Sequence, residues 1–507
     1  MHKKKGDTIP IFHTQAEEKR NAPTMKNRYG VPLFILFFML LLSACALGPD
    51  YQRPAIDTPD DYRYQAGEEG VAPLPADELP KGEWWRLYDD PVLDELQRRA
   101  AAGNRELQSA LARLEQARAA ARISDADLLP RLDLQPSAQR SRTPEDLAFM
   151  GAASTSSTIN LPLDLGYELD LWGRLRRQSQ AAGADFAASA AEVENFRLLL
   201  HGEVARTYFA LQTLDHELRL LEKTVELRRQ NLRLINSRYA GGLVDRLALS
   251  QAESEVGQAE AELIALRQQR AEFEHALALL LGESSSRFAL PRREHDDTET
   301  GDKALTRHIP TIDPGLPAAL LQRRPDVAAA ERRLMAASAR IGAAKSAFFP
   351  TIRLTGSAGF GSNELATLLN PGNRLWSLGG QLAQPVLDGG RSRAGLEQAE
   401  AAYFEELANY RQTILQAFKE VDDALLALKL LEQQQQAQQR ALGATRQSVE
   451  LSRQRYRAGL VSYLEVLESE RAALGLERAV LNTAGQRLQA NLSLIKALGG
   501  GWRDQGG

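Results

Sequence analysis

The sequence has one cysteine, two long stretches without proline, and no long apolar run beyond residue 45. A single thiol cannot form an internal disulfide, so the fold cannot depend on one. Proline is absent from 163–290 and from 386–507, which allows very long helices in both stretches. Because no later apolar run approaches the roughly 20 residues of a membrane-spanning helix, any membrane crossing by the mature chain must use strands.

Motifs for catalysis and cofactor binding are also missing. The sequence contains no P-loop, no HExxH and no His/Cys metal spacing, and its 7 histidines are scattered. Its net charge of −4 argues against a nucleic-acid partner, which needs clustered cationic side chains. We therefore expect no enzyme activity, no cofactor and no metal site.

The N-terminal region has the features of an export signal. Lys26 and Arg28 precede the apolar run Val31–Leu42, and Ser43-Ala44-Cys45 follows it. Twelve apolar residues are too few to span a bilayer, so this run is a signal-peptide core. The residues around Cys45 match the lipobox of bacterial lipoproteins, which predicts cleavage before Cys45 and a covalent lipid on it. The alternative is that Cys45 is only a small buried apolar residue.

The signal hypothesis has two further consequences. Residues 1–24 do not resemble a signal peptide, so we expect translation to start at Met25. Cleavage would remove seven Lys/Arg and three Asp/Glu, leaving 55 against 63 and a net charge of −8. By resemblance to lipoprotein sorting, Ala46 after the cysteine favours delivery to the outer membrane.

The chain repeats itself at an offset of 217 residues. The segment Arg238–Val244 (RYAGGLV) returns as Arg455–Val461 (RYRAGLV), and Leu281-Gly282 returns as Leu498-Gly499. A second match, Leu129-Pro130 with Phe349-Pro350, has an offset of 220, which places a three-residue length difference in a loop between the matches. The chain is therefore a tandem duplication, and each half needs the other half or further copies to close.

Each repeat is predicted to contain a long helical hairpin. From Leu211 to Tyr239 the apolar residues follow the 3,4 spacing of a coiled coil, and only Arg228 interrupts them. A helix from about Leu175 to Tyr239 would be roughly 100 Å long. Gly241-Gly242 ends it and a return helix runs to Leu281; the second repeat does the same around 458–459.

The segments between the helices alternate as strands do. Apolar residues occupy every second position from Ile159 to Leu171, and shorter alternating runs follow residues 131, 351 and 375. We expect four strands in two hairpins, with bends or edge positions at Pro136 and Pro162. If the apolar face meets lipid, charged residues of the other face line a lumen: Asp133, Asp164, Glu168, Asp170 and Arg353.

Four strands of this kind cannot close a membrane barrel, so several chains must contribute to one. The alternative is a pair of water-soluble hairpins packed on a helical bundle.

Several motifs along the whole mature chain resemble those of one family, the outer membrane factor lipoproteins of the NodT type, which are relatives of TolC. The motifs are Gly48-Pro49-Asp50-Tyr51 with Pro54, Trp84-Trp85 with Asp90-Pro91, Arg324-Pro325-Asp326-Val327 with Glu331, Phe349-Pro350, Asp388-Gly389-Gly390-Arg391 and Arg455-Tyr456-Arg457-Ala458-Gly459. The resemblance implies an α+β membrane protein with a TolC-like trimeric fold. It would have a shared β-barrel with four strands per chain, a long periplasmic α-helical barrel and a mixed equatorial domain.

The implied function is that of the exit duct of a tripartite efflux pump in the outer membrane. Such a duct conducts small molecules passively. It works as a homotrimer in outer membrane lipid, with a periplasmic adaptor and an inner-membrane RND-type transporter as partners, and it opens at its periplasmic end.

These considerations divide the chain into six segments. They are a signal peptide (1–44), a lipidated segment with part of the equatorial domain (45–94), repeat 1 (95–282), an equatorial linker (283–312), repeat 2 (313–499) and a tail (500–507). The hairpins of strands are expected at about 131–171 and 351–386, and the helical tips at about 240–245 and 457–462.

The resemblance also assigns two candidate sites. A periplasmic gate would consist of an apolar ring at Leu464, an acidic ring at Glu468, where the family more often has aspartate, and Tyr456 on the neighbouring helix. Leu464 could instead be an ordinary coiled-coil position, and Glu468 a solvated one. The adaptor-docking tips would be Gly241, Gly242, Leu243, Ala458, Gly459 and Leu460, although a helix reversal alone also needs glycine.

Two other functions are compatible with parts of the sequence. The same fold serves as the outer duct of type I protein secretion, but the lipid anchor and the Gly-Pro-Asp-Tyr start favour efflux. A periplasmic adaptor or scaffold lipoprotein would share the lipobox and the long helices. It would not need two duplicated strand hairpins, and no candidate for a lipoyl-like domain is present.

Overall fold

The structure, a computed structural model, describes residues 47–64, 74–75, 80, 82–147, 153–292, 301–306 and 309–503. The expected signal peptide, Cys45 and residues 504–507 lie outside these residues. None of the described helices combines the length and the apolar composition needed to cross a bilayer.

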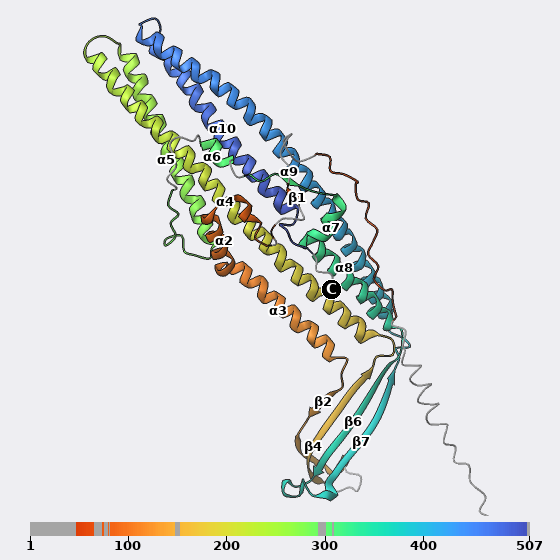
Figure 1. Cartoon of the computed structure of the whole chain (residues 1–507). Coiled ribbons are helices and arrows are strands. Elements are labelled where there is room, and N and C mark those ends of the chain that lie inside the picture. Colours follow the sequence, from red (N-terminus) through yellow and green to blue (C-terminus); the bar gives the residue numbers. More distant parts are fainter. Residues whose placement is uncertain are drawn as a thin grey trace, which may run out of the picture. The chain divides into compact units, whose positions relative to one another are not determined.

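The described elements follow one another in the order of two repeats joined by short segments (Figure 1). The α-helices are α2 (Pro91–Gly103), α3 (Arg105–Ala126), α4 (Arg174–Ala240), α5 (Arg246–Leu280), α6 (Gly301–Thr306), α7 (Leu320–Arg323), α8 (Pro325–Ser346), α9 (Arg391–Arg457) and α10 (Tyr463–Ala497). The strands are β1 (Leu74–Pro75), β2 (Arg131–Leu134), β3 (Ser137–Thr143), β4 (Ser154–Leu169), β5 (Ile312–Asp313), β6 (Thr351–Ser362) and β7 (Arg374–Ala383). Short 3-10 helices are η2 (Trp84–Tyr88), η3 (Glu145–Leu147), η4 (Pro317–Ala319), η5 (Leu365–Thr367) and η6 (Pro371–Asn373).

The helices of the two repeats match in length. Helices α3 and α8 both have 22 residues, α4 and α9 both have 67, and α5 and α10 both have 35. The predicted long helix of repeat 1 agrees with α4 to within a residue at each end, and the return helix was expected from about Asp245 to Leu281, within a residue of the bounds of α5. At 1.5 Å per residue, α4 and α9 are each about 100 Å long.

Each long helix begins beside the sheet at a glycine in the left-handed region. Gly173 has φ 78° and Gly390 has φ 86°, a conformation that glycine adopts without a steric penalty. An aspartate just before each glycine accepts hydrogen bonds from the first free amides. Asp170 accepts from the amide of Leu175 at 3.1 Å, and Asp388 accepts from that of Ser392 at 2.9 Å.

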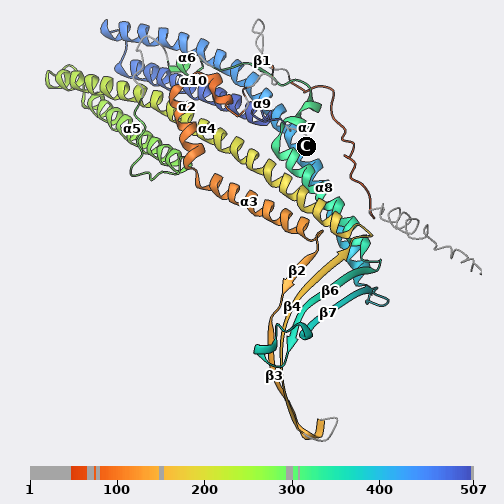
Figure 2. The same ribbon diagram turned by 60° about the horizontal axis from the view of Figure 1, so that its bottom comes forward.

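The large sheet is antiparallel, with β2 and β3 both paired to β4, followed by β6 and β7 (Figure 2). The sequence predicted four strands, but the first of them is divided into β2 and β3. Pro136 lies in the gap, which confirms the expected bend there. The expectation of an edge position at Pro162 was wrong: Pro162 lies within β4, which is paired on both sides, opposite Gly359 of β6. It lies beside the gap between β2 and β3, where the ladder is interrupted, and its carbonyl oxygen accepts a hydrogen bond from the amide of Gln135 at 3.2 Å.

The sheet therefore ends in two unpaired edges, β2/β3 on one side and β7 on the other. The helices follow the same order. Helix α4 packs against α3, α5, α8 and α10, whereas α9 packs against α8 and α10. One side of the described chain thus consists of β2, β3, α3 and α5, and the other of β7 and α9.

The main core lies where the N-terminal segment and the linker between the repeats pack on the long helices. Trp84, Tyr208 and Tyr410 are fully buried there, from η2, α4 and α9. Asp90 accepts a hydrogen bond from the hydroxyl of Tyr208 at 2.8 Å and caps α2, which explains the Trp-Trp and Asp-Pro motifs in structural terms. The short parallel pair β1–β5 joins the N-terminal segment to the linker between the repeats.

Candidate functional site: the helical tips and the two faces of the sheet

The two helical tips, tip 1 (residues 241–245) and tip 2 (458–462), have the same backbone structure. Gly242 has φ 72° and Gly459 has φ 74°. In tip 1 the amide of Leu243 donates to the carbonyl of Arg238, and in tip 2 the amide of Leu460 donates to that of Arg455, both at 2.9 Å. With the neighbouring glycine bonds these are Schellman motifs, which satisfy the last carbonyls of α4 and α9.

The leucines of both tips face solvent in the single chain. Leu243 is 78% exposed and Leu460 is 71% exposed. In a Schellman motif this residue often folds back onto the helix, so its exposure leaves an apolar side chain at each tip. The tips differ at the start of the return helix. Asp245 caps α5 by accepting from the amide of Ala248 at 2.9 Å, whereas Ser462 makes no side-chain cap on α10.

The three candidate gate residues lie beside tip 2. Leu464 and Glu468 are four residues apart in the first turns of α10, so they share one face of that helix. Leu464 is 42% exposed and Glu468 is also exposed. Hydrogen bonding to Glu255 raises the pKa of Arg471, and the nearby charge of Glu468 adds to that shift.

Tyr456 joins the two hairpins rather than standing with Leu464 and Glu468. Its hydroxyl accepts a hydrogen bond at 2.8 Å from a guanidinium nitrogen of Arg238, at the end of α4. The same guanidinium lies 5.4 Å from the centre of the Tyr456 ring, and the ring of Tyr463 packs 5.6 Å away. This contact holds the end of α9 to the end of α4, the helix of the other repeat.

A buried group of charges above the tips was missed at the sequence level. Arg228 of α4 is buried and donates to Glu470 of α10 at 2.9 Å, while its Nε lies 3.5 Å from Glu255 of α5. Arg453 of α9 donates to Glu470 at 2.8 Å, and Arg471 pairs with Glu255. All four helices of the two hairpins thus contribute to this network, which we call the four-helix charge network.

One sequence signal pointed to this network. Arg228 is the single residue that interrupts the 3,4 apolar spacing of α4. A buried arginine at such a position needs carboxylate partners, because an unpaired buried charge costs several kcal/mol. The partners lie 27 and 242 residues away, so the sequence indicated the need but not the pairing.

The two faces of the sheet differ in polarity. Directly opposed residues of an antiparallel pair share a face, so the register Leu165–Gly356–Leu378 and Leu163–Ala358–Trp376 defines an apolar face. Its large side chains are exposed in the single chain: Leu132, Leu134, Leu163, Leu165, Leu354, Trp376, Leu378 and Leu382. This is the pattern of strands that meet lipid on one side.

The opposite, polar face holds most of the predicted lumen charges. Asp133 pairs in register with Asp164, and Glu168 with Arg353. Asp170 was expected on this face, but β4 ends at Leu169 and the Asp170 carboxylate caps α4 instead. A carboxylate directly before a helix has free amides to bind, which explains the difference.

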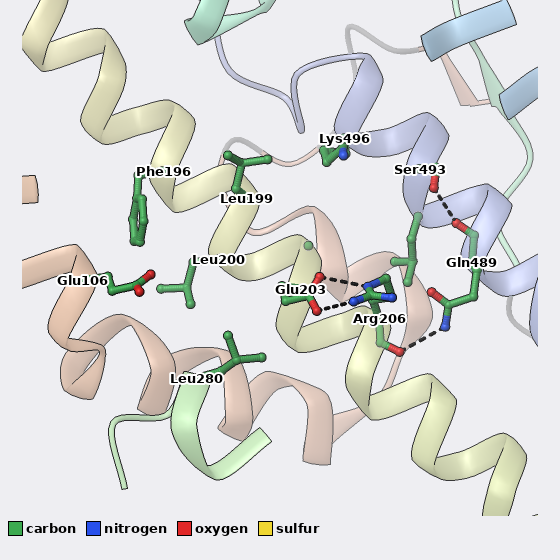
Figure 3. A pocket seen from close by; sticks show the side chains of 12 residues that line it. Glu106, Phe196, Leu199, Leu200, Glu203, Arg206, Leu280, Gln489, Ser493 and Lys496 are labelled. Atoms are coloured by element: carbon green, nitrogen blue, oxygen red, sulfur yellow. Dashed lines mark hydrogen bonds and ion pairs between the residues drawn. The ribbon is translucent and has the colours of Figure 1, made fainter. Parts of the chain in front are cut away.

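A pocket of about 360 Å³ lies between α3, α4, α10 and the end of α5 (Figure 3). Apolar side chains such as Phe196, Leu199 and Leu280 line it together with Glu106 and Glu203. The Glu203 carboxylate accepts a hydrogen bond from Arg206 at 2.8 Å, as the dashed lines in Figure 3 show.

In the second repeat, the side chain of Arg324 occupies the place that corresponds to this pocket. The residues matched to Glu106, Glu203 and Leu280 are Asp326, Glu420 and Ala497. All three contact the buried Arg324, whose guanidinium donates to Asp326 at 2.6 Å, to Glu420 at 2.7 Å and to the Ala497 carbonyl at 3.1 Å. Asn104 occupies the position matched to Arg324 and binds the Leu280 carbonyl at 2.9 Å.

Comparison with known proteins gives one consistent result. The sequence matches the family described as outer membrane efflux protein over residues 96–283 and 316–500. It is 36% identical over 473 residues to the solvent efflux pump outer membrane protein SrpC of Pseudomonas putida, covering 92% of this chain and 97% of SrpC. It is 33% identical over 464 residues to the cation efflux system protein CusC of Escherichia coli O6:H1, covering 92% and 97%.

A solved structure extends the likeness to the fold. The outer membrane channel CmeC of Campylobacter jejuni has a TM-score of 0.80 with this chain at 25% identity, covering 91% of this chain and 96% of CmeC. The two matched segments of the family correspond to the two repeats, which confirms the resemblance seen in the sequence motifs. The chain belongs to the outer membrane efflux protein family, whose members are the outer membrane channels of tripartite efflux pumps.

Proposed function

We propose that three copies of this chain form a passive exit duct whose periplasmic end is closed by Leu464, Glu468 and Tyr456 beside tip 2. The observation that carries the proposal is that one sheet has both two unpaired edges and two faces of opposite polarity. A sheet with an exposed apolar face is stable in lipid, but its edges must be paired there. Copies of the same chain supply the missing strands.

The edges support a closed ring of identical copies. The β2/β3, α3 and α5 side of one copy would meet the β7 and α9 side of the next, in the sheet and in the helices alike. Both sides expose large apolar side chains: Ile123 and Ile264 on the first, and Phe404, Leu415 and Leu430 on the second. Head-to-tail contacts of this kind close into a ring when the rotation between copies divides a full turn, as it would for three copies. Three copies would supply twelve strand positions, and the related channels are trimers.

The gate proposal concerns α10. Around a threefold axis, Leu464 would form an apolar ring and Glu468 an anionic ring one helical turn away. Three carboxylates close to one axis repel one another, so protonation would weaken that repulsion. Tyr456, bonded to Arg238, would hold the second hairpin against the first in the closed state.

The docking proposal concerns the tips. Gly241, Gly242 and Leu243 in repeat 1 and Ala458, Gly459 and Leu460 in repeat 2 would present the surface that a periplasmic adaptor binds. The exposed leucines provide apolar contact area at positions where the backbone is fixed by the Schellman motifs.

Anchoring and energy supply complete the proposal. Cys45 would carry the lipid that places the chain at the outer membrane. The chain itself would catalyse nothing and need no cofactor, and an inner-membrane RND-type transporter would supply the energy. One relative is named for solvent efflux and another for cation efflux, so we propose that small-molecule selection lies in the transporter and not in this duct.

The test is single-channel conductance of the purified trimer in planar bilayers. The variants are Leu464→Ala and Glu468→Ala, and the matched controls are Leu247→Ala and Gln251→Ala, which occupy the same positions of repeat 1. We expect small, mostly closed events for wild type and controls, and much larger conductance for both gate variants. Equal conductance of all proteins would retain the channel and reject the gate, whereas absence of any conductance would reject the duct.

A further inference from the structure

Two arginines at the loop end of the sheet lie on its apolar face. In the register of β3 with β4, Ala138 opposes Ile159, Arg140 opposes Ser157 and Arg142 opposes Thr155. Opposed residues share a face, so both arginines lie on the face of Ile159. The hydroxyls of Ser141 and Ser156, one residue away, meet at 3.2 Å on the other face, which fixes the orientation independently.

A third arginine lies on the same face at the other edge of the sheet. Arg374, the first residue of β7, opposes Phe360 of β6, which in turn opposes Leu161 of β4. Trp376, two residues further along β7, lies on the same face and is 79% exposed. Within the described strands of the large sheet the apolar face carries these three arginines and no carboxylate, whereas Asp133, Asp164 and Glu168 lie on the polar face.

The three arginines lack partners that other arginines nearby have. Arg131 of the polar face pairs with Asp133 at 2.8 Å, and Arg174 pairs with Glu168 at 2.7 Å. Arg140, Arg142 and Arg374 are exposed, and no described side chain forms an ion pair or a hydrogen bond with any of them. Their positive charge is therefore available to a group outside the chain.

We propose that Arg140, Arg142 and Arg374 bind the phosphate groups of anionic lipids in the outer leaflet. The proposal rests on the proposed function, because it requires the apolar face to meet lipid and the strand loops to face the exterior. Beyond the apolar rows of β4, this face meets the head groups, where aromatic residues such as Trp376 also concentrate. Arginine binds phosphate through two parallel N–H donors, so the guanidinium matches this ligand.

The ring places the arginines of two neighbouring copies along one seam. Strand β3 is at one edge of the sheet and β7 at the other, so β7 of one copy lies beside β2/β3 of the next. Neighbouring strands are about 4.8 Å apart, so the two arginines of one copy and Arg374 of the next lie on the same face, on either side of that seam. Anionic lipids along the seam would contact both copies, so bound lipid stabilises the trimer as well as its position in the leaflet.

The test measures lipid binding to the detergent-solubilised trimer by native mass spectrometry. The probes are lipid A, which carries phosphates, and its dephosphorylated form. The first variant is Arg140→Gln/Arg142→Gln, and its matched control is Arg131→Gln/Arg353→Gln, which removes two arginines from the polar face. The second variant adds Arg374→Gln to the first.

We expect wild type and control to prefer lipid A. Each arginine near an anionic lipid contributes about 1 kcal/mol, so binding of lipid A should weaken about fivefold per substitution and roughly a hundredfold in the triple variant. The dephosphorylated lipid should bind equally to all proteins, and inorganic phosphate at millimolar concentration should not displace lipid A. Trimer mass in the same spectra shows that each variant is assembled.

Three results would overturn the proposal: equal binding of both lipids by wild type, undiminished binding of lipid A by the triple variant, or displacement of lipid A by inorganic phosphate. Conductance measured on the same preparations shows whether failure of the lipid proposal also means failure of the proposed duct function. A trimer that conducts normally but shows no preference for lipid A remains a duct without this lipid site.

Discussion

Helices α4 and α9 have the same length but differ in how much of their surface other helices cover. Of their 67 residues each, 23 are buried in α4 and 11 in α9. Helix α4 is covered on both sides by helices of its own chain, whereas α9 forms one edge. The duplication has therefore produced an interior copy and an edge copy from one unit, and the edge copy retains a face for a neighbouring chain.

The two repeats also differ at single matched positions. Where repeat 2 has the buried Arg324 with two carboxylates, repeat 1 has Asn104 and a pocket. Where repeat 1 has the buried His201, repeat 2 has Phe418. A substitution in one repeat can therefore be controlled by a substitution at the matched position of the other.

The largest expected effect is at Arg324. Arg324→Gln leaves the carboxylates of Asp326 and Glu420 without their shared cation, and we expect a loss of about 4 kcal/mol in the free energy of unfolding. At the matched position, Asn104→Ala removes a helix cap and the hydrogen bond to the Leu280 carbonyl, which should cost about 2 kcal/mol. Urea unfolding in detergent measures both. Equal losses would mean that the two positions are energetically alike despite their chemistry.

The four-helix charge network should give the next effect. Arg228→Met leaves Glu255 and Glu470 buried without this partner, so local opening of the hairpin ends should become easier by about 3 kcal/mol. Hydrogen exchange of the α4 amides near residue 228 should accelerate by roughly a hundredfold. The matched control is Thr445→Ala in repeat 2, for which exchange should stay unchanged. Unaltered exchange in the Arg228 variant would show that the network does not hold the hairpins together.

A pH dependence should distinguish the repeats as well. His201 is buried, its Nδ1 lies 2.6 Å from Gln97 Oε1, and burial lowers its pKa to about 4. The unfolded chain takes up this proton near pH 6.5 and the folded chain only near pH 4, so stability falls as the pH drops through that window. The loss should reach about 3 kcal/mol.

His201→Phe, which copies Phe418 of repeat 2, should remove this part of the pH dependence of the free energy of unfolding. Unfolding free energies of both proteins at several values between pH 7 and pH 4 measure the difference. Parallel curves would assign the acid sensitivity to other groups.

The smallest expected effect concerns the contact between the tips. Tyr456→Phe removes the hydrogen bond from Arg238, a bond to a charged donor that contributes about 1.5 kcal/mol, so the open probability should rise about tenfold. Tyr239→Phe, at the matched position of repeat 1, should change it by less than about twofold. Single-channel recordings measure both, and equal changes would mean that the two tips contribute alike to closure.

The helical part of the fold could be predicted because it depends on local signals. The absence of proline, the 3,4 spacing and the glycines at Gly241-Gly242 together determine where α4 begins and ends. The strands were predicted for the same reason, since alternation is a local pattern. The division of the first strand into β2 and β3 also follows from one residue, Pro136, and the sequence indicated a bend there.

The candidate site could be predicted less completely because its contacts join distant segments. Tyr456 was assigned to the gate by a motif, but its partner Arg238 comes from the other repeat. The charge network needs four helices to be in place before any pair forms. Asp170 was assigned to the polar face because it continues the alternation of β4, and the free amides of α4 compete for its carboxylate. Leu464 and Glu468 remain predictions until the channel is measured.

The equal lengths of α4 and α9 have a consequence for how such a chain can evolve. One residue added to either helix would turn every later side chain by about 100° and shift its tip by about 1.5 Å. Arg228 would then point away from Glu470, and Arg238 away from Tyr456, while the other hairpin stayed in place. Insertions and deletions in the two long helices are therefore tolerated only in pairs, so the duplication preserves length more strictly than it preserves sequence.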